Sequence, residues 1–414
     1  MASLGHEVVV VDIDTVKIDE LNAGRIPFFE PGLGELFASV RALNRLVFTT
    51  ELGAISDSEI NFLCIGTPQS SDGLAADLTG LEAAFSEVIS KAKTGSVLVG
   101  KSTVPVGTAE RMAREIAVQK KAVTLNWNPE FLREGHAVAD TLEPNRIVIG
   151  AQQPSEAVAL SDFYKSVCPS APQFITDFPT AELVKVAANA FLATKISFIN
   201  AMSEIADATG ADVRLLADAI GIDDRIGRKF LGAGIGFGGG CLPKDIRAFL
   251  ARADELGLGD SLAFLREFDL INQRARARAV ALALRELGNP EGKKIAVLGA
   301  AFKPESDDVR DSPALEIAET LRTLGANVVV TDPRALDTAA AKLPELTYCD
   351  SLHQTLEGAD LTMLLTEWND YRNLNPSEII GLVKTPTIFD GRNILDEKLW
   401  QAAGWKLLAL GRSF

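Results

Sequence analysis

The sequence predicts an α/β protein in which two Rossmann-like, doubly wound domains are joined by a central helical domain. Residues 3–14 and 323–333 share one pattern: a helix end closed by glycine, then a buried β-branched strand that ends in aspartate. This pattern is the second half of a βαβ unit. Only Met1 and Ala2 precede the first copy. The first domain is therefore expected to lack its first strand, glycine turn and most of the following helix.

Strand-like runs alternate with helical patterns on both sides of a helical middle section, which is typical of α/β domains. The expected strands are 59–66, 96–101, 123–126, 146–150, 361–365 and 387–390, and residues 293–302 are expected to be a strand that runs into a glycine turn. The expected helices are 78–93, 181–208, 261–287 and 312–324, the last with Ser312 as its N-cap. The domains are expected at 1–178, 179–290 and 291–414.

Composition excludes several classes of protein. The chain has 414 residues and a formal charge of −15, which argues against nucleic acid or an anionic membrane as the main partner. It has no apolar run of about 20 residues and no signal-peptide pattern, so a cytoplasmic protein is expected. Four scattered cysteines and three histidines offer neither a disulfide framework nor a metal site.

The segment Gly232–Asp245 reads GAGIGFGGGCLPKD, with six glycines in nine residues before Cys241. Glycines allow close approach of the backbone to a ligand. Lys244, and a helix that begins near Pro243, would favour the thiolate of Cys241. The alternative is a flexible loop that holds a buried cysteine, and we favour the functional interpretation because structural cysteines usually lie in apolar surroundings.

Two further segments place charged residues where they could act in catalysis. In the segment 182–189, three polar residues share one face of an apolar helix: Glu182, Lys185 and Asn189. If Lys185 is buried, it could stabilise an oxyanion. The alternative is an ordinary surface ion pair between Lys185 and Glu182. Glu130 and Glu134 would share a face if residues 128–135 were helical, and could activate water or simply stabilise a helix N-terminus.

Residues at strand ends are candidates for ligand binding, because open α/β sheets bind ligands there. Thr103 follows a strand and could hydrogen-bond a ligand or water. Asp12 matches the acid that binds the adenine ribose of NAD, although Asp332 is placed equivalently in the other copy. Both cannot bind the same cofactor.

Taken together and in order, these motifs resemble the UDP-glucose/GDP-mannose dehydrogenase family over nearly the whole chain. The motifs are Glu30-Pro-Gly-Leu33, Ile65-Gly-Thr-Pro68, KSTVPVGT, NPEFLREG, ELVKVAANAF, DDRIG, GFGGGCLPKD, AFKPESDDVRDSP and FDGRN. The DDRIG segment is more similar to the UDP-glucose branch than to the GDP-mannose branch.

The resemblance implies a four-electron oxidation of UDP-glucose to UDP-glucuronate with two NAD, through a thiohemiacetal and a thioester on Cys241. It implies that Arg225 reaches the sugar of the neighbouring subunit, and this role and the length of the central helices lead us to expect a homodimer. The catalytic residues that it implies are Cys241, Lys185, Asn189, Asp245, Glu130 and Thr103. The cofactor-binding residues are Asp12, Lys17, Thr67, Thr103, Glu134, Lys244 and Arg310. The substrate-binding residues are Glu130, Phe131, Leu132, Lys185, Asn189, Arg225, Lys229, Phe237, Gly238, Lys303 and Arg392.

Two departures and three alternatives remain. The family's GxGYVG-type turn is not in this sequence, and its glycines would bring backbone donors to the NAD pyrophosphate. Gly240 stands where many members have serine. The substrate could instead be GDP-mannose or UDP-N-acetylmannosamine. The chain could be a non-catalytic UDP-sugar-binding paralogue, or a relative such as 6-phosphogluconate dehydrogenase that removes two electrons without a cysteine nucleophile.

Overall fold

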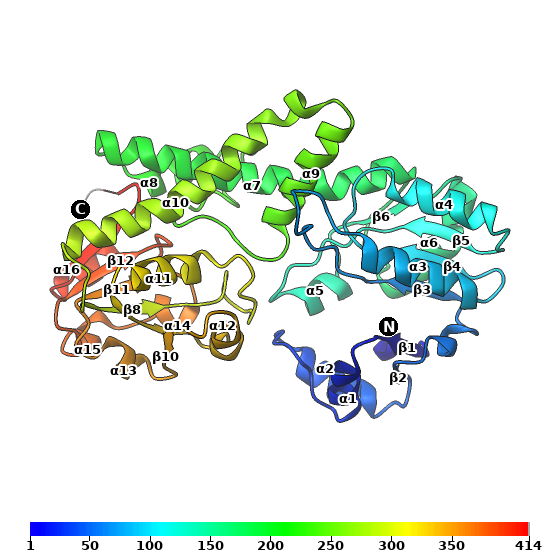
Figure 1. Ribbon diagram of the computed structural model, residues 1–414, viewed down its shortest axis with the longest axis horizontal. Coiled ribbons are helices and arrows are strands. Elements are labelled where there is room, and N and C mark those ends of the chain that lie inside the picture. Colours follow the sequence, from blue (N-terminus) through cyan, green and yellow to red (C-terminus); the bar gives the residue numbers. More distant parts are fainter. Residues whose placement is uncertain (413–414) are drawn as a thin grey trace. The chain divides into compact units, whose positions relative to one another are not determined.

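The computed structural model describes residues 1–412 and consists of two compact units, each formed from discontinuous segments. Unit 1 contains Met1–Ala188 and Lys244–Gly259, and unit 2 contains Asn189–Pro243 and Asp260–Phe414. Figure 1 shows the order of their elements. None of the helices within residues 1–412 has both the length and the apolar character that crossing a membrane requires.

Unit 2 contains a complete doubly wound sheet of six parallel strands, in the order β10-β9-β8-β11-β12-β13. With β8 as the first strand, this is the 3-2-1-4-5-6 order of a Rossmann domain. The strands are β8 (Lys294–Leu298), β9 (Asn327–Thr331), β10 (Thr347–Tyr348), β11 (Leu361–Leu364), β12 (Thr387–Asp390) and β13 (Lys406–Ala409). The expected second α/β domain is confirmed.

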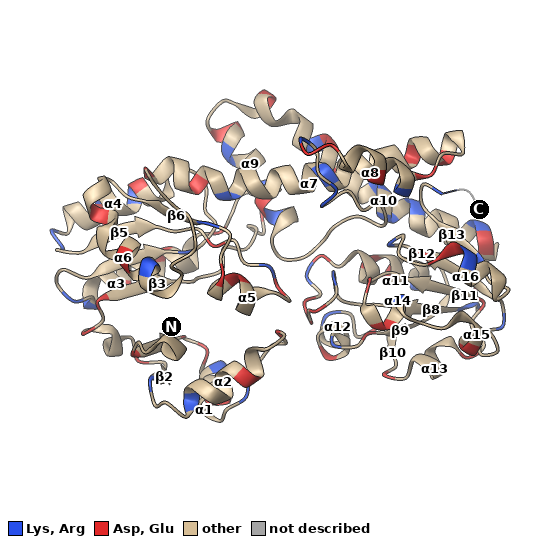
Figure 2. Ribbon diagram, turned by 180° about the vertical axis from the view of Figure 1, so that it is seen from behind, with Lys and Arg blue, Asp and Glu red and all other residues tan. Residues whose placement is uncertain are grey.

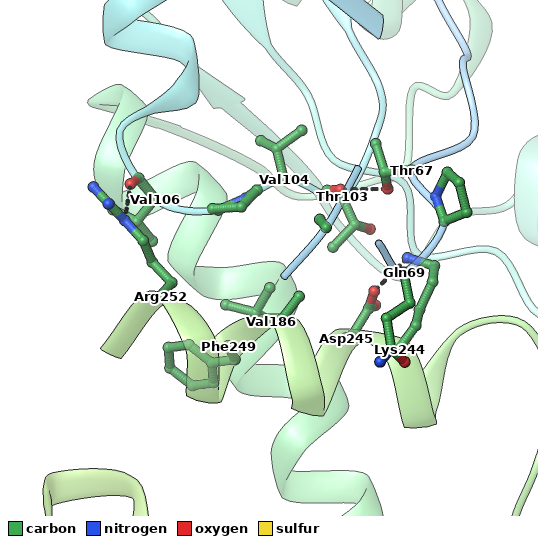
Figure 3. A pocket seen from close by; sticks show the side chains of 14 residues that line it. Thr67, Gln69, Thr103, Val104, Val106, Val186, Lys244, Asp245, Phe249 and Arg252 are labelled. Atoms are coloured by element: carbon green, nitrogen blue, oxygen red, sulfur yellow. Dashed lines mark hydrogen bonds and ion pairs between the residues drawn. The ribbon is translucent and has the colours of Figure 1, made fainter. Parts of the chain in front are cut away.

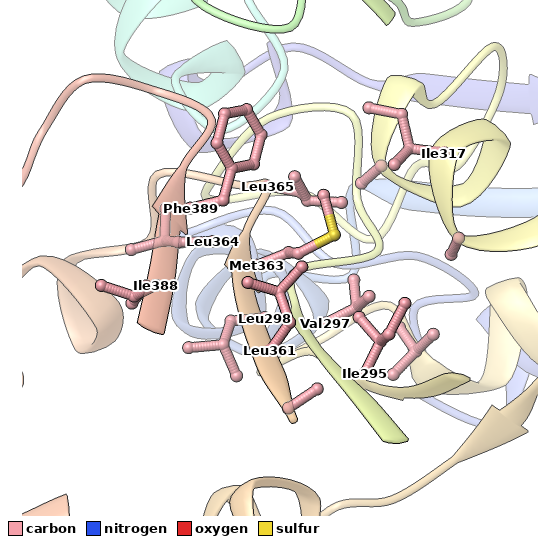
Figure 4. Close-up of a cluster of buried hydrophobic side chains, with 14 of the residues drawn as sticks. Ile295, Val297, Leu298, Ile317, Leu361, Met363, Leu364, Leu365, Ile388 and Phe389 are labelled. Carbon is pink, nitrogen blue, oxygen red and sulfur yellow. The ribbon is translucent and has the colours of Figure 1, made fainter. Parts of the chain in front are cut away.

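The core of this sheet is formed by the aliphatic side chains of its central strands and of the helix that covers it. Figure 4 shows Ile295, Val297 and Leu298 of β8 beside Met363 and Leu364 of β11, all fully buried. Central parallel strands are covered on both faces, which explains why they read as continuous apolar runs.

The helices of this part of the chain connect the parallel strands. They are α11 (Pro313–Thr323), α12 (Leu336–Lys342), α13 (Leu352–Leu356), α14 (Asn369–Arg372), α15 (Pro376–Ile379) and α16 (Glu397–Ala402). The side chain of Ser312 accepts a hydrogen bond from Leu315 N, and Pro313 occupies the first turn of α11. The predicted N-cap of this helix is confirmed.

Unit 1 contains two separate sheets. One has five strands in the order β3-β4-β5-β6-β7, and the other is the parallel pair β1-β2. The strands are β1 (Val8–Val11), β2 (Leu46–Thr49), β3 (Ile60–Leu63), β4 (Val97–Gly100), β5 (Thr124–Trp127), β6 (Ile147–Gly150) and β7 (Gln173–Thr176). The pair β1-β2 and the five-stranded sheet correspond to the two sides of the strand order found in unit 2. Among the described residues, no pairing joins β1 to β3. The expected α/β character of this part is confirmed.

Six helices lie between these strands along the chain, and Leu81, Phe85 and Met112 from two of them pack on the five-stranded sheet. They are α1 (Thr15–Asn22), α2 (Leu33–Arg41), α3 (Thr79–Lys91), α4 (Thr108–Val118), α5 (Ala137–Leu142) and α6 (Val158–Val167).

Long helices dominate the middle of the chain, as predicted. They are α7 (Phe178–Thr209), α8 (Val213–Gly221), α9 (Leu242–Glu255) and α10 (Ala263–Leu287). Residues 222–241 between α8 and α9 form a loop without regular structure. Figure 2 shows acidic and basic residues interspersed along the helices and loops.

Candidate active site

The segment after β4 forms one wall of a small cavity in unit 1 (Figure 3). Its lining includes Thr67, Thr103, Lys244 and Asp245, together with apolar side chains such as Val186. The hydroxyl of Thr67 donates to the carbonyl oxygen of Thr103 at 2.8 Å, which joins the loops that follow β3 and β4. Residues from three separate motifs thus line one cavity beside the carboxyl ends of parallel strands.

Cys241 immediately precedes α9, and the first turn of this helix contains Lys244 and Asp245. The predicted helix start near Pro243 is confirmed. Cys241 is exposed, so the alternative of a buried structural cysteine is wrong. Lys244 Nζ lies 2.5 Å from the carboxylate of Asp245, which is 3% exposed. The N-terminal end of a helix favours negative charge on a neighbouring sulfur.

Lys185 is a buried lysine whose charge is balanced by Glu130. Its Nζ lies 3.1 Å from Glu130 Oε1 and 5.5 Å from the centre of the Phe131 ring. The other Glu130 oxygen accepts a hydrogen bond from Leu132 N at 2.6 Å. Lys185 and Asn189 are one turn apart on α7, and both are less than one-tenth exposed. A buried lysine of this kind can stabilise developing negative charge on a substrate oxygen.

Glu182 does not pair with Lys185, so the alternative of a surface ion pair is wrong. Its carboxylate is 1% exposed and accepts hydrogen bonds from the backbone N–H groups of Gly107 and Ala109, each at 2.7 Å. These groups lie at the start of α4. Arg252 of α9 donates to Val106 O at 2.9 Å, so the loop that carries Thr103 is held from two helices. Burial raises the pKa of Glu182 to about 7, although the backbone hydrogen bonds oppose this shift.

This raised pKa predicts a pH-dependent stability. Between pH 4.5 and about 7 the folded protein binds more protons than the unfolded chain, so the free energy of unfolding falls as the pH rises. We expect Glu182→Gln to remove up to about 3 kcal/mol of this dependence. Denaturant unfolding from pH 4.5 to 7.5 measures the effect, with Glu87→Gln on the exposed face of α3 as control. If the difference in the free energy of unfolding between wild type and Glu182→Gln were the same at every pH, the prediction would be contradicted.

Residues 128–135 do not form a helix, so Glu130 and Glu134 do not share a helix face, contrary to the conditional expectation. Helix α5 begins only at Ala137. The segment is held instead by Glu30, whose carboxylate accepts hydrogen bonds from Gly135 N at 2.8 Å and Ala137 N at 2.7 Å. A backbone held by its own N–H groups needs no helix to have a defined conformation. Sequence analysis noted Glu30 within a motif but gave it no role.

Lys101 is a further charged residue that sequence analysis did not assign, although it begins a recognised motif. Its Nζ donates to Asn128 Oδ1 at 2.9 Å, and the same oxygen accepts from the hydroxyl of Tyr164. Burial lowers the pKa of Lys101 to about 8, while Cys64 and Glu130 oppose the shift. A second cation therefore lies near the Glu130 carboxylate.

Unit 2 holds most of the residues expected to bind the nucleotide sugar. Phe237 and Gly238 lie in a buried loop, and Arg392 Nη1 donates to Gly236 O of the same loop at 2.8 Å. Lys303 Nζ lies 5.4 Å from the centre of the Phe302 ring. These residues surround the carboxyl end of β8, where a doubly wound sheet binds its ligand.

Arg225, Lys229 and Arg310 occupy exposed positions in unit 2. The side chain of Arg225 is 88% exposed and pairs with Asp223 at 2.6 Å, so it is accessible to a ligand or to another chain. Lys229 is exposed in the same loop. Arg310 pairs with Asp308 at 2.7 Å. A Cβ atom at Gly240 would lie 2.3 Å from the Arg310 guanidinium, the movable end of a flexible side chain, so serine could be accommodated there.

Asp12 and Asp332 have different surroundings, although their sequence patterns match. Asp332 is 5% exposed and accepts hydrogen bonds from Ala300 N, Ala301 N and Trp368 Nε1. Asp12 accepts from Asp14 N and lies 2.6 Å from Lys17 Nζ, with its side chain 31% exposed. Of the two carboxylates, the one in unit 1 is therefore available to a ligand.

These residues fit two parts of a dinucleotide. Asp12 offers an accessible acceptor at the end of β1, as a ribose diol requires. The cavity beside Thr67 and Thr103 combines apolar walls with a few polar groups, as a nicotinamide ring requires. Glu134 is half-buried in the loop after β5, and Lys244 lines the cavity.

Comparison with known families assigns each part of the chain. Residues 1–168 match the NAD binding domain of the UDP-glucose/GDP-mannose dehydrogenase family, residues 179–274 its central domain and residues 296–397 its UDP binding domain. NAD is therefore the cofactor, and the C-terminal part is a UDP binding domain.

Full-length relatives agree with this assignment. UDP-glucose 6-dehydrogenase YwqF of Bacillus subtilis is 40% identical over 100% of this chain and 94% of the relative. UDP-glucose 6-dehydrogenase of Rhizobium meliloti is 39% identical over 99% and 95%. The structure of a UDP-glucose dehydrogenase from Pyrobaculum islandicum matches with a TM-score of 0.89 at 37% identity, over 100% of this chain and 94% of that one. The chain therefore belongs to the UDP-glucose/GDP-mannose dehydrogenase family.

Proposed function

We propose that this protein oxidises UDP-glucose to UDP-glucuronate in two successive two-electron steps, with two NAD consumed for each sugar. The observation that carries the proposal is the exposed Cys241 at the start of α9, followed by Lys244 and Asp245 in the first turn. A single alcohol oxidation needs no nucleophile, whereas oxidation of an aldehyde to an acid is aided by a covalent sulfur adduct. Relatives that share the full length of the chain are named UDP-glucose 6-dehydrogenases.

The chemistry follows from this assignment. Bound NAD would supply the hydride acceptor for the C6 alcohol, and a second NAD, bound after the first has left as NADH, would supply it for the adduct that follows. The Cys241 sulfur forms a bond to C6 of the aldehyde, and the aldehyde oxygen becomes the alkoxide of a thiohemiacetal. Loss of hydride leaves a thioester. Water then adds to the thioester carbon, the C–S bond breaks, and the thiolate leaves with the acid as the second product.

The roles of the other residues follow from the charge that each step develops. Lys185, buried and positively charged beside Glu130, donates to the substrate oxygen while it carries negative charge. Asn189 and Asp245 hold the same oxygen or the attacking water. Glu130 takes the proton of that water, with Thr103 as its helper. Phe131 and Leu132 contact the sugar.

Ligand contacts remote from C6 complete the proposal. Asp12, Lys17, Thr67, Glu134, Lys244 and Arg310 bind NAD, and Arg225, Lys229, Phe237, Gly238, Lys303 and Arg392 bind the nucleotide sugar. We assign residues 1–178 to an NAD-binding domain, residues 179–290 to a central domain and residues 291–414 to a UDP-sugar-binding domain.

The proposal is tested by the amount of NADH formed from limiting UDP-glucose at saturating NAD. We expect two NADH and one UDP-glucuronate for each sugar. One NADH for each sugar, with an aldehyde product, would reject the cysteine-dependent second oxidation. Oxidation of GDP-mannose or UDP-N-acetylmannosamine in preference to UDP-glucose would reject the proposed substrate.

We further propose that the protein is a homodimer. Phe191, Phe198 and Ile205 recur every seven residues along α7 and are 65%, 42% and 58% exposed. Residues seven apart lie on one helix face. Leu215 of α8 and Ile222 add to the exposed apolar area of unit 2, at 68% and 83% exposed. Exposed apolar surface of this kind marks a protein contact, and a second copy of the chain is the partner that we assign.

This assembly predicts a mass of two chains in light scattering at micromolar concentration. Ile205→Lys places a charge in the apolar row and is expected to shift the protein toward one chain, because an unpaired charge opposes burial. The control is Leu399→Lys on α16, where the side chain is 53% exposed outside the row. A monomeric wild-type protein would contradict the proposal.

A further inference from the structure

The glycine-rich loop that leads to Cys241 is packed tightly inside unit 2. Residues 233–239 are buried, in contrast to the exposed Cys241. A Cβ atom at Gly236 would lie 2.4 Å from Asn272 Oδ1, and one at Gly238 would lie 2.0 Å from Asp311 O. The glycines of this loop therefore serve close packing, and the loop is not a flexible tether.

Asn272 of α10 binds both polar groups of one loop residue. Its Oδ1 accepts a hydrogen bond from Phe237 N at 2.8 Å, and its Nδ2 donates to Phe237 O at 3.0 Å. Asn272 is 2% exposed. This arrangement satisfies the donor and the acceptor of the Phe237 backbone with a single side chain, as a neighbouring strand would do.

Arg276 lies one turn further along α10 and binds both Phe237 and the chain segment on the other side of the loop. It donates to Phe237 O at 2.8 Å and, through Nη1, to Asp311 at 2.9 Å and to Glu316. Arg276 is 5% exposed, and its buried charge is balanced by these two carboxylates.

The segment that follows β8 forms this opposite wall. Asp311 has a φ of 46°, a left-handed conformation that is costly for a residue other than glycine. Gly239 N donates to Arg310 O at 2.9 Å. The loop is therefore fixed between α10 on one side and Arg310–Asp311 on the other, and backbone strain is retained at the point of closest approach.

We propose that Asn272 and Arg276 are positioning residues that fix the Phe237 backbone, so that the glycines after it hold Cys241 at the start of α9 for attack on the nucleotide sugar. The inference rests on the proposed function. Six glycines in nine residues would otherwise give a highly flexible segment. A nucleophile on a flexible segment loses the advantage of preorganised geometry, and small misplacements reduce rates strongly.

The test compares Asn272→Ala with Gln273→Ala. Gln273 is the next residue of α10, is exposed and donates to Asp269 at 3.2 Å. We expect Asn272→Ala to lower kcat about 10²-fold and to raise the KM for UDP-glucose. The KM for NAD should not change, and Gln273→Ala should resemble wild type. A smaller active fraction caused by misfolding would lower kcat without changing either KM.

Arg276→Lys adds a conservative comparison. Lysine keeps the positive charge and one donor but loses the planar fork that joins Phe237 to the two carboxylates. Its kcat should lie between those of wild type and Arg276→Ala. Equal activity of Arg276→Ala and wild type would overturn the role of Arg276.

Two readouts do not require dehydrogenase activity. In Asn272→Ala, the amide hydrogen of Phe237 should exchange at least about tenfold faster, and the pH profile of Cys241 alkylation by iodoacetamide should change. If wild type forms no NADH from UDP-glucose but these changes occur, the proposed function fails and loop positioning is supported. If a folded Asn272→Ala shows wild-type exchange, alkylation and kinetics, the inference is overturned.

Discussion

Replacing Cys241 with alanine is expected to abolish formation of UDP-glucuronate, with a loss of at least about 10³-fold in the rate of acid production. The exposed sulfur at the N-terminal end of α9 is the only group to which the proposal assigns a covalent bond with C6. Without it, the aldehyde has no thiohemiacetal to oxidise. The variant should therefore form at most one NADH for each bound sugar, measured in a single turnover with product analysis.

Cys349→Ala provides the matched control for this experiment. Cys349 also lies in unit 2, is half-buried, and places its sulfur 3.5 Å from Ser351 O in a loop after β10. It should retain wild-type stoichiometry. A Cys241→Ala protein that still produced acid with two NADH would reject covalent catalysis and would favour a dehydrogenase without a cysteine nucleophile.

The doubly wound domains were predictable because their signals are local. A glycine-closed helix followed by a β-branched strand was sufficient to identify β9, and Ser312-Pro313 was sufficient to place the start of α11. The long helices α7 and α10 followed from continuous helical periodicity and differ from prediction by no more than three residues at either end. Signals of this kind depend on residues within one or two turns of each other.

The contacts of the candidate site were less predictable, because periodicity shows which face of a helix is apolar but not what covers it. For Lys185, the sequence offered a surface pair with Glu182 or a role in stabilising an oxyanion, but it did not predict the ion pair with Glu130, which is 55 positions earlier. Glu182 binds the start of α4, 73 and 75 positions earlier. Glu130 and Glu134, four positions apart, would have shared a face only if the loop after β5 were helical. Its conformation is set instead by Glu30, which is more than 100 positions away.

Replacing Lys185 with methionine is expected to lower kcat by about 10²- to 10³-fold, an effect comparable to removal of an oxyanion-stabilising donor. Methionine keeps much of the length and apolar character of the side chain but removes the charge. In the wild type, the Lys185 side chain is 6% exposed and its Nζ lies 3.1 Å from Glu130 Oε1. Its loss leaves the substrate oxygen without a cation and leaves Glu130 with its hydrogen bond from Leu132 N.

Lys165→Met is the control, because Lys165 also forms an ion pair, with Asp162 at 2.8 Å, but is 65% exposed on α6. Exposed pairs of this type contribute little to stability, so this variant should keep wild-type kinetics and unfolding. Comparison of Lys185→Met, Glu130→Gln and the double variant then separates charge balance from catalysis. The rate compared is that of the first NADH in a single turnover, because the proposed role of Glu130 begins only at hydrolysis of the thioester. If Lys185 acted only by neutralising Glu130, the double variant would recover most of the lost rate of this step, because no carboxylate would remain there to be neutralised. If Lys185 donates to the substrate oxygen, as proposed, the double variant will remain at least as slow as Lys185→Met.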